Sequence, residues 1–428
     1  MLKTDLTTIP NENLKSGEKP EKYGIYLHVP FCVQKCRYCG FYSLPGCGVE
    51  LMERYVRALK KEAEAVLGRI VVDTVFIGGG TPSLLPEGAI PEILGCISEN
   101  AMIDENAEIS VESNPGTLTK NKLDSYIKSK VNRISMGAQS FDDSVLRSIG
   151  RIHDSAEIKR SFAMAREAGF KNINLDLMFA LPGQSRKSWE KTLKEALALS
   201  PEHLSFYSLQ LEEGTPMFED FRAGRIDQIP DEDDRAEYHA ALLILREAGY
   251  EHYEISNAAK LGAGQKRGDI SPYRCRHNLK YWHFRPYIGL GAGASSFTGS
   301  VRYTAAADIQ RYIDFWEKDG AAEEFCCILS ESEHEINAVY SEIHENTLAD
   351  SAGEFVFTAL RTREGVNFSE FERTFGKKFD AVFAFAGAKI KKWEMEGLVK
   401  LSKDSLSLTE KGIDISNSIM SEFVSVEI

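Results

Sequence analysis

Short apolar runs alternate with longer amphipathic stretches through the first half of the chain. The short runs are rich in β-branched residues and predict strands, whereas apolar residues three or four positions apart predict helices. The predicted strands are residues 24–29, 73–77, 108–112, 133–137, 173–178 and 204–209. The predicted helices between them include residues 51–67, 118–130, 155–168 and 188–199. Asp154 and Gly169 have the residue types that begin and end a helix, and they flank the third of these helices.

A succession of strand–helix units predicts an α/β fold with a parallel sheet, either an open barrel or a doubly wound sheet. Polar and unusual residues recur at or near the ends of the predicted strands. They are the cysteines of residues 32–39, the glycines of residues 78–80, Glu112, Gln139 and Asp176. In a β/α barrel the carboxyl ends of the strands converge on one mouth, which carries the active site. We therefore expect a partial (β/α)6 barrel over residues 23–308, after a polar segment at residues 1–22.

The pattern changes after about residue 308. Residues 354–428 contain helical patterns, then two short apolar runs around a turn at residues 403–405, and a last helix. This order predicts a small winged-helix-like α+β module over residues 309–428. Such a module either reads DNA or serves packing and docking. The segment is rich in Glu and lacks a basic stripe, which favours packing or docking.

The charge balance narrows the function classes. The 428 residues carry a formal net charge of −13, whereas a general nucleic-acid binder needs an excess of Lys and Arg. No apolar run approaches the roughly 20 residues of a membrane helix, and the N-terminal segment lacks the apolar region of a signal peptide. We therefore expect a cytoplasmic protein with no nucleic-acid partner. In that compartment the eight cysteines are expected to be thiols or metal ligands rather than disulfides.

Three of these cysteines form the densest chemical signal. Cys32, Cys36 and Cys39 stand at CxxxCxxC spacing directly after the first predicted strand. Three thiolates can ligate three irons of a [4Fe–4S] cluster, and the fourth iron then stays open. An open iron can hold the amino and carboxylate groups of S-adenosylmethionine (SAM). A structural zinc site is the alternative, with Cys47 as its fourth ligand beyond a Leu-Pro-Gly turn.

A glycine-rich turn, Gly78-Gly-Gly-Thr-Pro-Ser83, follows the second predicted strand. Glycines let backbone groups approach a ligand closely. A phosphate-binding loop would continue with Lys and then Ser or Thr at fixed spacing, which this turn lacks. Beside the cysteine loop, the turn predicts a contact for the amino group of the bound methionine.

These motifs resemble those of the radical SAM superfamily and, within it, the anaerobic coproporphyrinogen III oxidase-like family. The matching segments are the cysteine loop and residues 78–82, 112–116, 139–141, 150–153 and 174–183, in that order. The run His277-Asn-x-x-Tyr281-Trp282 is similar to the mark of the haem chaperone HemW subfamily. The resemblance covers about residues 24–302, and the C-terminal module is similar to the C-terminal domain of the same family.

The resemblance implies a radical SAM barrel with a [4Fe–4S] cluster and SAM as cofactors. It places the cluster on Cys32, Cys36 and Cys39. The chemistry of several further residues agrees, because carboxylates accept hydrogen bonds from hydroxyl or ammonium groups and an Arg can clamp a carboxylate. The residues implied to contact SAM are Tyr26, Tyr38, Gly79, Gly80, Thr81, Glu112, Gln139, Arg151 and Asp176.

Two functions follow from the resemblance. The first is a haem chaperone that binds haem and passes it to an unknown acceptor protein, with an electron donor for the cluster. Membrane contact would then come only through the acceptor. The second is an oxygen-independent coproporphyrinogen III oxidase, a radical SAM oxidative decarboxylase of porphyrin biosynthesis. Those enzymes carry a further cysteine at the position of Phe41, so this residue favours the chaperone, and no catalytic residue is assigned.

Residues 273–302 carry a signal of their own. No Asp or Glu occurs between Asp269 and Asp308, and the cations of the segment are Arg274, Arg276, Lys280, Arg285 and Arg302. Such a stretch attracts anions, and interleaved aromatic rings suit a flat macrocycle with two propionates. We predict a haem site with His277 or Cys275 as iron ligand, formed by Cys275, His277, Asn278, Tyr281 and Trp282. The alternative is that the aromatic rings pack at the open edge of the barrel and the cations face solvent.

Overall fold

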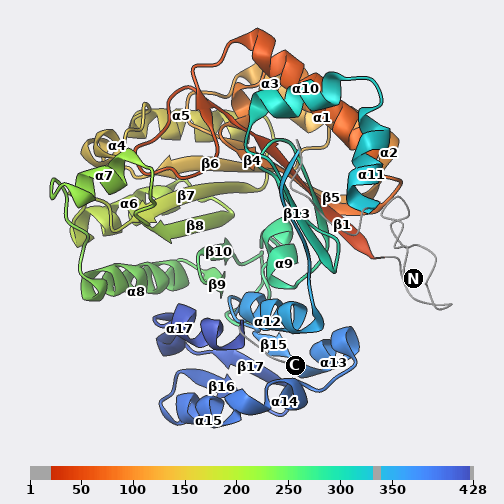
Figure 1. Cartoon of the computed structure of the whole chain (residues 1–428). Helices are drawn as coiled ribbons and strands as arrows, with labels where there is room; N and C mark the ends of the chain where they lie inside the picture. Colours follow the sequence, from red (N-terminus) through yellow and green to blue (C-terminus); the bar gives the residue numbers. More distant parts are fainter. Residues whose placement is uncertain (1–20, 331–338, 425–428) are drawn as a thin grey trace.

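The computed structural model describes residues 21–330 and 339–424, so almost all of the predicted polar segment 1–22 lies outside the described residues. Within these ranges one sheet has twelve strands, and its central strands follow one another in chain order and run parallel (Figure 1). A doubly wound sheet would reverse this order at a switch point. The expected partial (β/α)6 barrel is confirmed, and its strands are β1 (Lys22–Val29), β4 (Val71–Gly79), β5 (Met102–Ser113), β6 (Arg133–Gln139), β7 (Ile173–Phe179) and β8 (His203–Ser208).

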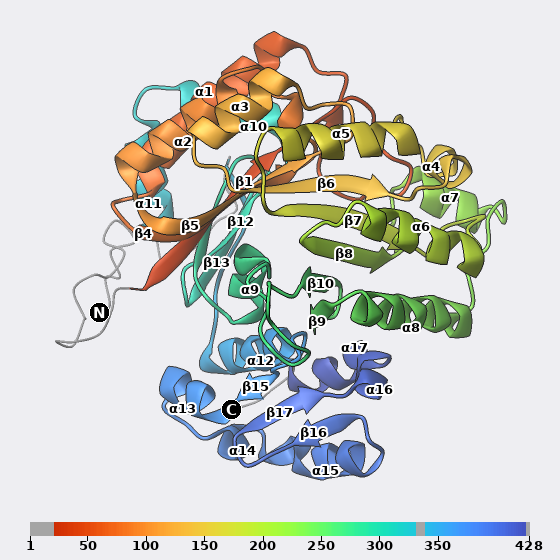
Figure 2. The ribbon, with the colours of Figure 1, turned by 180° about the vertical axis from the view of Figure 1, so that it is seen from behind.

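The connecting helices lie along the outer side of this sheet (Figures 1 and 2). Their ends follow local chemistry: Asp154 accepts a hydrogen bond from the backbone N–H of Glu157, and Gly169 has the left-handed backbone of a helix end. The predicted cap residues are thus confirmed. The helices are α1 (Val49–Val66), α2 (Ala89–Asn100), α3 (Lys120–Lys128), α4 (Asp143–Ser148), α5 (Ser155–Glu167) and α6 (Arg186–Ala198).

Side chains alternate between the two faces of each barrel strand. One set is apolar and packs beneath the helices, as with Val111 of β5, Met136 of β6 and Leu175 of β7. The other set faces the barrel interior and is polar, as with Ser135 and Asn174. The interior of a closed β/α barrel is usually filled by layers of branched apolar residues. This barrel instead keeps a polar interior.

The sheet continues beyond the barrel at both edges. Next to β1 lie β11 (Tyr287–Leu290), β12 (Ser295–Phe297), β13 (Val301–Ala305) and β14 (Tyr340–Glu345), whereas β10 (Asn257–Lys260) and β9 (Tyr250–Glu254) follow β8. Strand β14 lies beyond residue 308, yet it pairs with β13. The sheet therefore extends to residue 345, beyond the domain boundary that the sequence placed at residue 308. Between β13 and β14 the chain forms α10 (Ile309–Glu317) and α11 (Ala321–Ser330), which pack on α1.

A short helix, α9 (Arg276–Trp282), closes the inner end of the barrel, opposite the mouth. Lys280 of α9 donates to the backbone carbonyl of Lys22 at 2.8 Å and forms an ion pair with Asp73 at 2.7 Å. Both partners lie near the amino ends of their strands. A Cβ atom at Gly24 would lie only 2.8 Å from Cδ of Lys280, so glycine at this position lets α9 approach the strands.

The C-terminal module packs below α9 in Figure 1. The predicted hairpin is present, because β16 (Val399–Leu401) pairs with β17 (Ser405–Leu408), and β15 (Val366–Asn367) completes a small antiparallel sheet. With its helices the module has the expected winged-helix-like arrangement. The helices are α12 (Leu348–Ala359), α13 (Phe368–Phe375), α14 (Phe379–Val382), α15 (Gly387–Met395), α16 (Glu410–Ile413) and α17 (Ser416–Met420).

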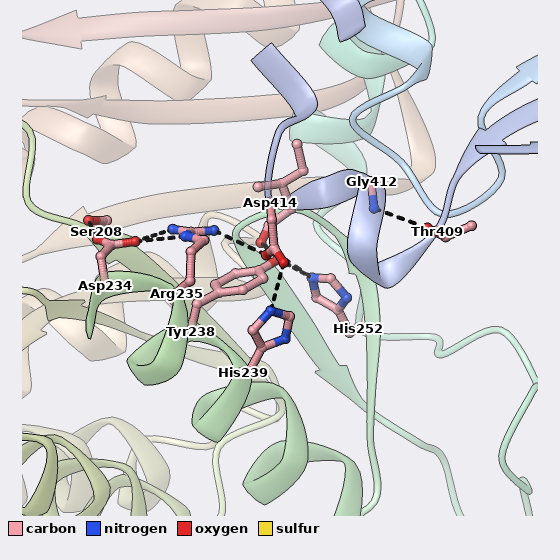
Figure 3. A network of polar contacts seen from close by, with 10 residues as sticks. Ser208, Asp234, Arg235, Tyr238, His239, His252, Thr409, Gly412 and Asp414 are labelled. Carbon is pink, nitrogen blue, oxygen red and sulfur yellow. Dashed lines mark hydrogen bonds and ion pairs between the residues drawn. The ribbon is translucent and has the colours of Figure 1, made fainter. Parts of the chain in front are cut away.

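Charged side chains join this module to α8 (Asp231–Glu247), the last long helix of the barrel part; the shorter α7 (Pro216–Arg222) precedes it. Asp414 lies 3.0 Å from Nε2 of His239 and 3.8 Å from the guanidinium of Arg235 (Figure 3). A second ion pair joins Arg246 to Glu410. These contacts fix the module against the barrel. No helix in the described ranges is long and apolar enough to cross a bilayer.

Candidate functional site

The three predicted cluster cysteines lie on one loop at the mouth of the barrel. β2 (Phe31–Cys32) follows β1 and pairs with β3 (Leu44–Pro45), and this pairing closes the base of the loop. The backbone N–H of Leu44 donates to the carbonyl of Pro30 at 2.6 Å, and that of Cys39 donates to the carbonyl of Cys36 at 3.2 Å. All three cysteines are partly exposed. The loop is therefore anchored at its base while its thiols stay accessible.

Two polar residues contact these thiols from other parts of the barrel. A guanidinium N–H of Arg151 donates to Sγ of Cys36 at 3.3 Å, and the hydroxyl of Thr81 lies 3.6 Å from Sγ of Cys32. Arg151 also donates to the carbonyl of Gly137 and to the side chain of Asn114. A nearby cation favours the thiolate, which is the form that binds metal. Arg151 thus places a positive charge beside Cys36, whereas burial raises the pKa of the Cys39 thiol.

The cysteine loop fits an iron–sulfur cubane better than a zinc ion. A structural zinc needs four ligands around one point, and in the described ranges no group of three His, Cys, Asp or Glu side chains could hold a metal ion. A cubane instead takes each thiolate on a different iron, so the sulfur atoms need not meet. Sγ of Cys47 lies near the carbonyl of Leu44, at 3.8 Å. Phe41, two residues after Cys39, is 69% exposed and offers no ligand atom.

The glycine turn packs directly against the base of the cysteine loop. The backbone N–H of Gly80 donates to the carbonyl of Val29 at 2.9 Å, and that of Thr81 donates to the carbonyl of Phe31 at 2.7 Å. A Cβ atom at position 80 would lie 2.7 Å from the latter oxygen. Only glycine fits there without displacing the loop. The predicted methionine contacts thus lie beside the predicted cluster ligands.

Glu112 and Asp176 provide two buried carboxyl groups inside the barrel. Glu112 accepts a hydrogen bond from the backbone N–H of Gly79 at 3.1 Å, and Asp176 accepts from Asn174 at 2.8 Å and from Ser135 at 3.2 Å. Burial, and then the nearby Asp176, raises the pKa of Glu112 to about 8. Burial also raises the pKa of Asp176. Ionising these carboxyl groups is costly because they are buried, and hydroxyl donors or a sulfonium ion beside them would reduce that cost. The pair therefore fits the ribose hydroxyls or the sulfonium of SAM.

A cavity of about 170 Å³ inside the barrel joins the two sites that the sequence predicted separately. Its lining includes Tyr26, Glu112 and Asp176 from the predicted SAM site. It also includes three residues of the predicted haem site, which are His277, Asn278 and Tyr281. The two sets of residues are therefore two parts of one cavity, and α9 forms its inner end.

The remaining predicted SAM contacts lie nearer the mouth. Arg151 lines a second, smaller cavity together with Cys36 and Thr81. Gln139 is the last residue of β6 and has a left-handed backbone. Its side-chain amide folds back beside Gly137, because a Cβ atom added there would lie 3.1 Å from the amide nitrogen. Tyr38 packs against a small apolar cluster formed by Val145, Ile149, Met178, Leu181 and Met217.

The two predicted haem ligands are buried and occupied by other contacts. His277 has Nδ1 2.9 Å from the hydroxyl of Thr74 and Nε2 2.8 Å from the hydroxyl of Tyr281. Burial, and then Lys280, lowers the pKa of His277 to about 3, so the ring is neutral. Cys275 is fully buried, and its thiol lies 3.7 Å from the carboxylate of Glu108. Iron could reach either atom only after α9 moves.

The expectation of an anion-attracting surface over residues 273–302 is wrong. Acidic residues from distant parts of the chain neutralise four of its five cations, and Arg276 instead donates to backbone carbonyls. Residues 273–302 contain no Asp or Glu, but the fold places acidic side chains from other segments next to these cations. The pairs are Arg274 with Glu251 and Glu364, Lys280 with Asp73, Arg285 with Glu370, and Arg302 with Glu354.

The aromatic residues of the same segment pack within the protein. The rings of Tyr281 and Tyr287 meet edge to face with centroids 4.6 Å apart. The guanidinium of Arg361, from the C-terminal module, lies 4.4 Å from the ring centroid of Trp282. The packed rings agree with the first part of the alternative interpretation, in which the aromatic residues pack within the protein. Its second part, cations that face solvent, does not hold, because four of the five cations form ion pairs.

Sequence reasoning missed several polar residues of the barrel interior. Arg133, Ser135, Asn174 and Ser205 all line the cavity, and none was singled out. The available signal is the alternation within the strands, where each of these residues is followed by a buried apolar one. In a barrel covered by helices, the polar members of such a strand must face inward.

Comparisons with known proteins agree with this geometry. The family description "Radical SAM superfamily" matches residues 26–196, and "HemN C-terminal domain" matches residues 346–415. The solved structure of coproporphyrinogen III oxidase (HemN) from Escherichia coli, described as a radical SAM enzyme, has a TM-score of 0.79 and covers 98% of this chain and 92% of its own. Its sequence identity is 24%, so this likeness concerns the fold. Fold and site together define a radical SAM protein.

Two relatives narrow this class. The heme chaperone HemW of Bacillus subtilis is 33% identical over 407 residues, which cover 93% of this chain and 98% of the relative. The heme chaperone HemW of Escherichia coli is 39% identical over 274 residues, which cover 63% of this chain and 68% of the relative. The chain belongs to the heme chaperone HemW family of radical SAM proteins.

Proposed function

We propose that this protein is a cytoplasmic haem chaperone that carries a [4Fe–4S] cluster with SAM, binds haem and passes it to an acceptor protein. The observation that carries the proposal is similarity to a heme chaperone over nearly the whole length of both chains. Phe41 adds support, because the position that holds a further cysteine in the porphyrinogen oxidases here bears an exposed phenyl ring.

In this proposal the mouth of the barrel holds the cofactors. Cys32, Cys36 and Cys39 hold the cluster, and Arg151 stabilises the Cys36 thiolate. The glycine turn offers backbone groups to the methionine part of SAM, and Glu112 and Asp176 offer carboxylates to its ribose hydroxyls or sulfonium. When bound, the cluster and SAM would supply one-electron redox chemistry, which needs an electron donor protein. The contacts proposed for the remaining SAM residues follow from the family resemblance.

Haem is proposed to bind at the segment 273–285, with His277 or Cys275 as iron ligand. The segment is closed in this structure, because His277 contacts Thr74 and Tyr281 and the cations have acidic partners. Haem binding there therefore requires α9 to leave the barrel strands. This requirement makes the proposal testable, since a covalent tether between α9 and the barrel would block haem uptake.

One experiment separates the chaperone from the alternative, an oxygen-independent coproporphyrinogen III oxidase. The observation that favours the alternative is the fold shared with HemN over 98% of this chain. Anaerobically reconstituted protein is titrated with haem, mixed with apomyoglobin as a generic acceptor, and separately incubated with coproporphyrinogen III, SAM and a reductant. We expect a Soret band that saturates near one haem per chain, and no decarboxylated porphyrinogen. Decarboxylated product without haem binding would establish the oxidase instead.

A further inference from the structure

Arg133, the first residue of β6, is a buried cation that forms no hydrogen bond or ion pair through its side chain within the described residues. It is 2% exposed, and its Nε atom is fully enclosed and unbonded. A guanidinium carries five N–H donors, and a buried charge without hydrogen bonds is costly. Natural proteins keep such a group mainly where a ligand or water completes it.

The two acids that could neutralise Arg133 are directed elsewhere. Glu108 accepts hydrogen bonds from the backbone N–H groups of Arg276 and His277, both at 3.1 Å, and so holds the start of α9. Asp176 accepts from Asn174 and Ser135. Neither carboxylate forms an ion pair with Arg133 among the described residues, and their negative charges act on the guanidinium only through space. The guanidinium is therefore available to a molecule in the cavity that it lines.

Arg133 lies at the opposite end of the barrel from the cysteine loop. It begins β6, whereas Gln139 ends the strand near the mouth. Six residues at about 3.3 Å each place the two backbones about 20 Å apart. SAM held at the cluster by its amino and carboxylate groups, as proposed above, would keep that carboxylate at the mouth and away from Arg133.

The side chains around Arg133 suit a small polar anion. Asn278 of α9 lines the same cavity, and its side-chain amide has no hydrogen-bond partner in the part of the chain that the structure describes. Tyr207 adds a phenol, while Ser135 and Ser205 add hydroxyls. The cavity, at about 170 Å³, is below the usual range for drug-sized ligands and far too small for a macrocycle.

We propose that the inner end of the barrel binds a small organic carboxylate, which pairs bidentately with the Arg133 guanidinium and accepts a further hydrogen bond from the Asn278 amide. A carboxylate matches the parallel N–H groups of an arginine in geometry and charge. The ligand is a molecule other than haem and SAM, so the inference goes beyond the chaperone function. It also does not depend on that function.

The test uses the reconstituted holoprotein and sodium propionate as probe, at constant ionic strength, with 1-propanol as the uncharged control. Binding is followed by calorimetry and by the unfolding temperature. We expect saturable binding of propionate and none of propanol, and at least a tenfold loss of propionate affinity in Arg133→Met. Arg186→Met removes an exposed arginine of α6 and should bind propionate as the wild type does.

Folding of the variants is itself informative. Methionine fills a similar length without a charge, so Arg133→Met should fold at least as stably as the wild type when no ligand is present. If it does not fold, Arg133→Lys retains the charge but not the bidentate geometry, and it should still lose most propionate affinity. A folded Arg133→Lys protein with wild-type affinity would overturn the proposal.

Three further outcomes would also overturn it. The first is that the wild type shows no saturable propionate binding, and the second is that Arg133→Met binds propionate as tightly as the wild type. The third is that SAM displaces propionate completely and that Arg133→Met loses as much SAM affinity as propionate affinity. The last would identify SAM itself as the occupant. Cluster absorbance and haem titration are recorded in every sample, so a failure of haem binding is distinguished from a failure of the carboxylate site.

Discussion

Arg151 donates a hydrogen bond to Sγ of Cys36 at 3.3 Å, although 115 residues separate the two in the sequence. The same guanidinium bonds the carbonyl of Gly137 and the side chain of Asn114. It therefore connects the cysteine loop to the ends of two barrel strands. It places a positive charge beside one proposed cluster ligand and fixes that residue relative to the barrel mouth.

Replacing Arg151 by methionine should weaken cluster retention without unfolding the barrel. The variant loses a charge-assisted hydrogen bond of roughly 1.5–3 kcal/mol to the Cys36 thiolate. We expect reconstituted Arg151→Met to lose iron to a chelator at least several-fold faster than the wild type, as measured by the decay of the cluster absorbance. Arg147→Met, an exposed arginine on α4, is the control. Equal decay rates in wild type and Arg151→Met would show that the contact does not support the cluster.

The cluster should depend on three cysteines and not on the fourth nearby one. Cys32→Ala, Cys36→Ala and Cys39→Ala should each abolish the cluster, whereas Cys47→Ala should keep about four irons per chain, as one cubane contains. SAM should change the EPR spectrum of the reduced wild type and of Cys47→Ala. Loss of iron in the Cys47 variant would contradict an open-iron site.

Glu112→Gln should change the pH dependence of stability. The raised pKa of about 8 means that the folded wild type holds this proton well above the ordinary value near 4.5. The stabilising contribution of the protonated form is full below pH 4.5 and is lost as pH rises through 8. We expect Gln, which remains neutral, to exceed the wild type at pH 8 by roughly 4 kcal/mol in unfolding free energy and to match it near pH 4.5. Chemical denaturation across this pH range provides the measurement.

The same substitution should lower SAM affinity. Ionised Glu112 is the stronger acceptor, so the SAM affinity of the wild type should rise as pH increases toward 8, whereas that of Glu112→Gln should be lower and nearly constant. Loss of one charge-assisted bond corresponds to roughly 1.5–3 kcal/mol. Calorimetric titration of cluster-loaded protein with SAM tests this. A wild-type affinity that is flat between pH 6 and 9 would remove Glu112 from the SAM site.

His277→Ala should destabilise the protein, because the hydroxyls of Thr74 and Tyr281 lose a buried partner. We expect a loss of about 2 kcal/mol in unfolding free energy. Haem titration of the folded variant, of Cys275→Ala and of His344→Ala, an exposed histidine outside the segment, then tests the proposed iron ligand. A shifted Soret band in only one of the first two identifies the ligand, and unchanged spectra in both place the iron elsewhere.

The parallel strands could be predicted because each is a compact apolar run and the first five carry a motif in the strand or near its end. The same local logic predicted the Asp154 cap and the β16–β17 hairpin. Contacts between distant segments could not be predicted in this way. Arg274 meets Glu364 across 90 residues, so a segment without acids in sequence becomes neutral in space. Strand β14 was missed because two helices separate it from β13 and most of its residues are exposed.

Inside the barrel, the residues recognised in advance were those with motif partners, such as Glu112 and Asp176. Arg133 lies at the start of a strand, outside any motif, and its significance comes from the partners it lacks. A single sequence does not show which buried cation will be left unpaired, because that depends on where Glu108 is directed by α9.

The sequence predicts that the cations in and beside α9 bind an anion. In the structure, they instead connect the barrel to the C-terminal module. Arg274 and Arg285 meet Glu364 and Glu370 of that module, and Arg361 of the module covers Trp282. The floor of the cavity is thus built partly on the module. Any displacement of the module would therefore act on the floor of the cavity through these side-chain contacts.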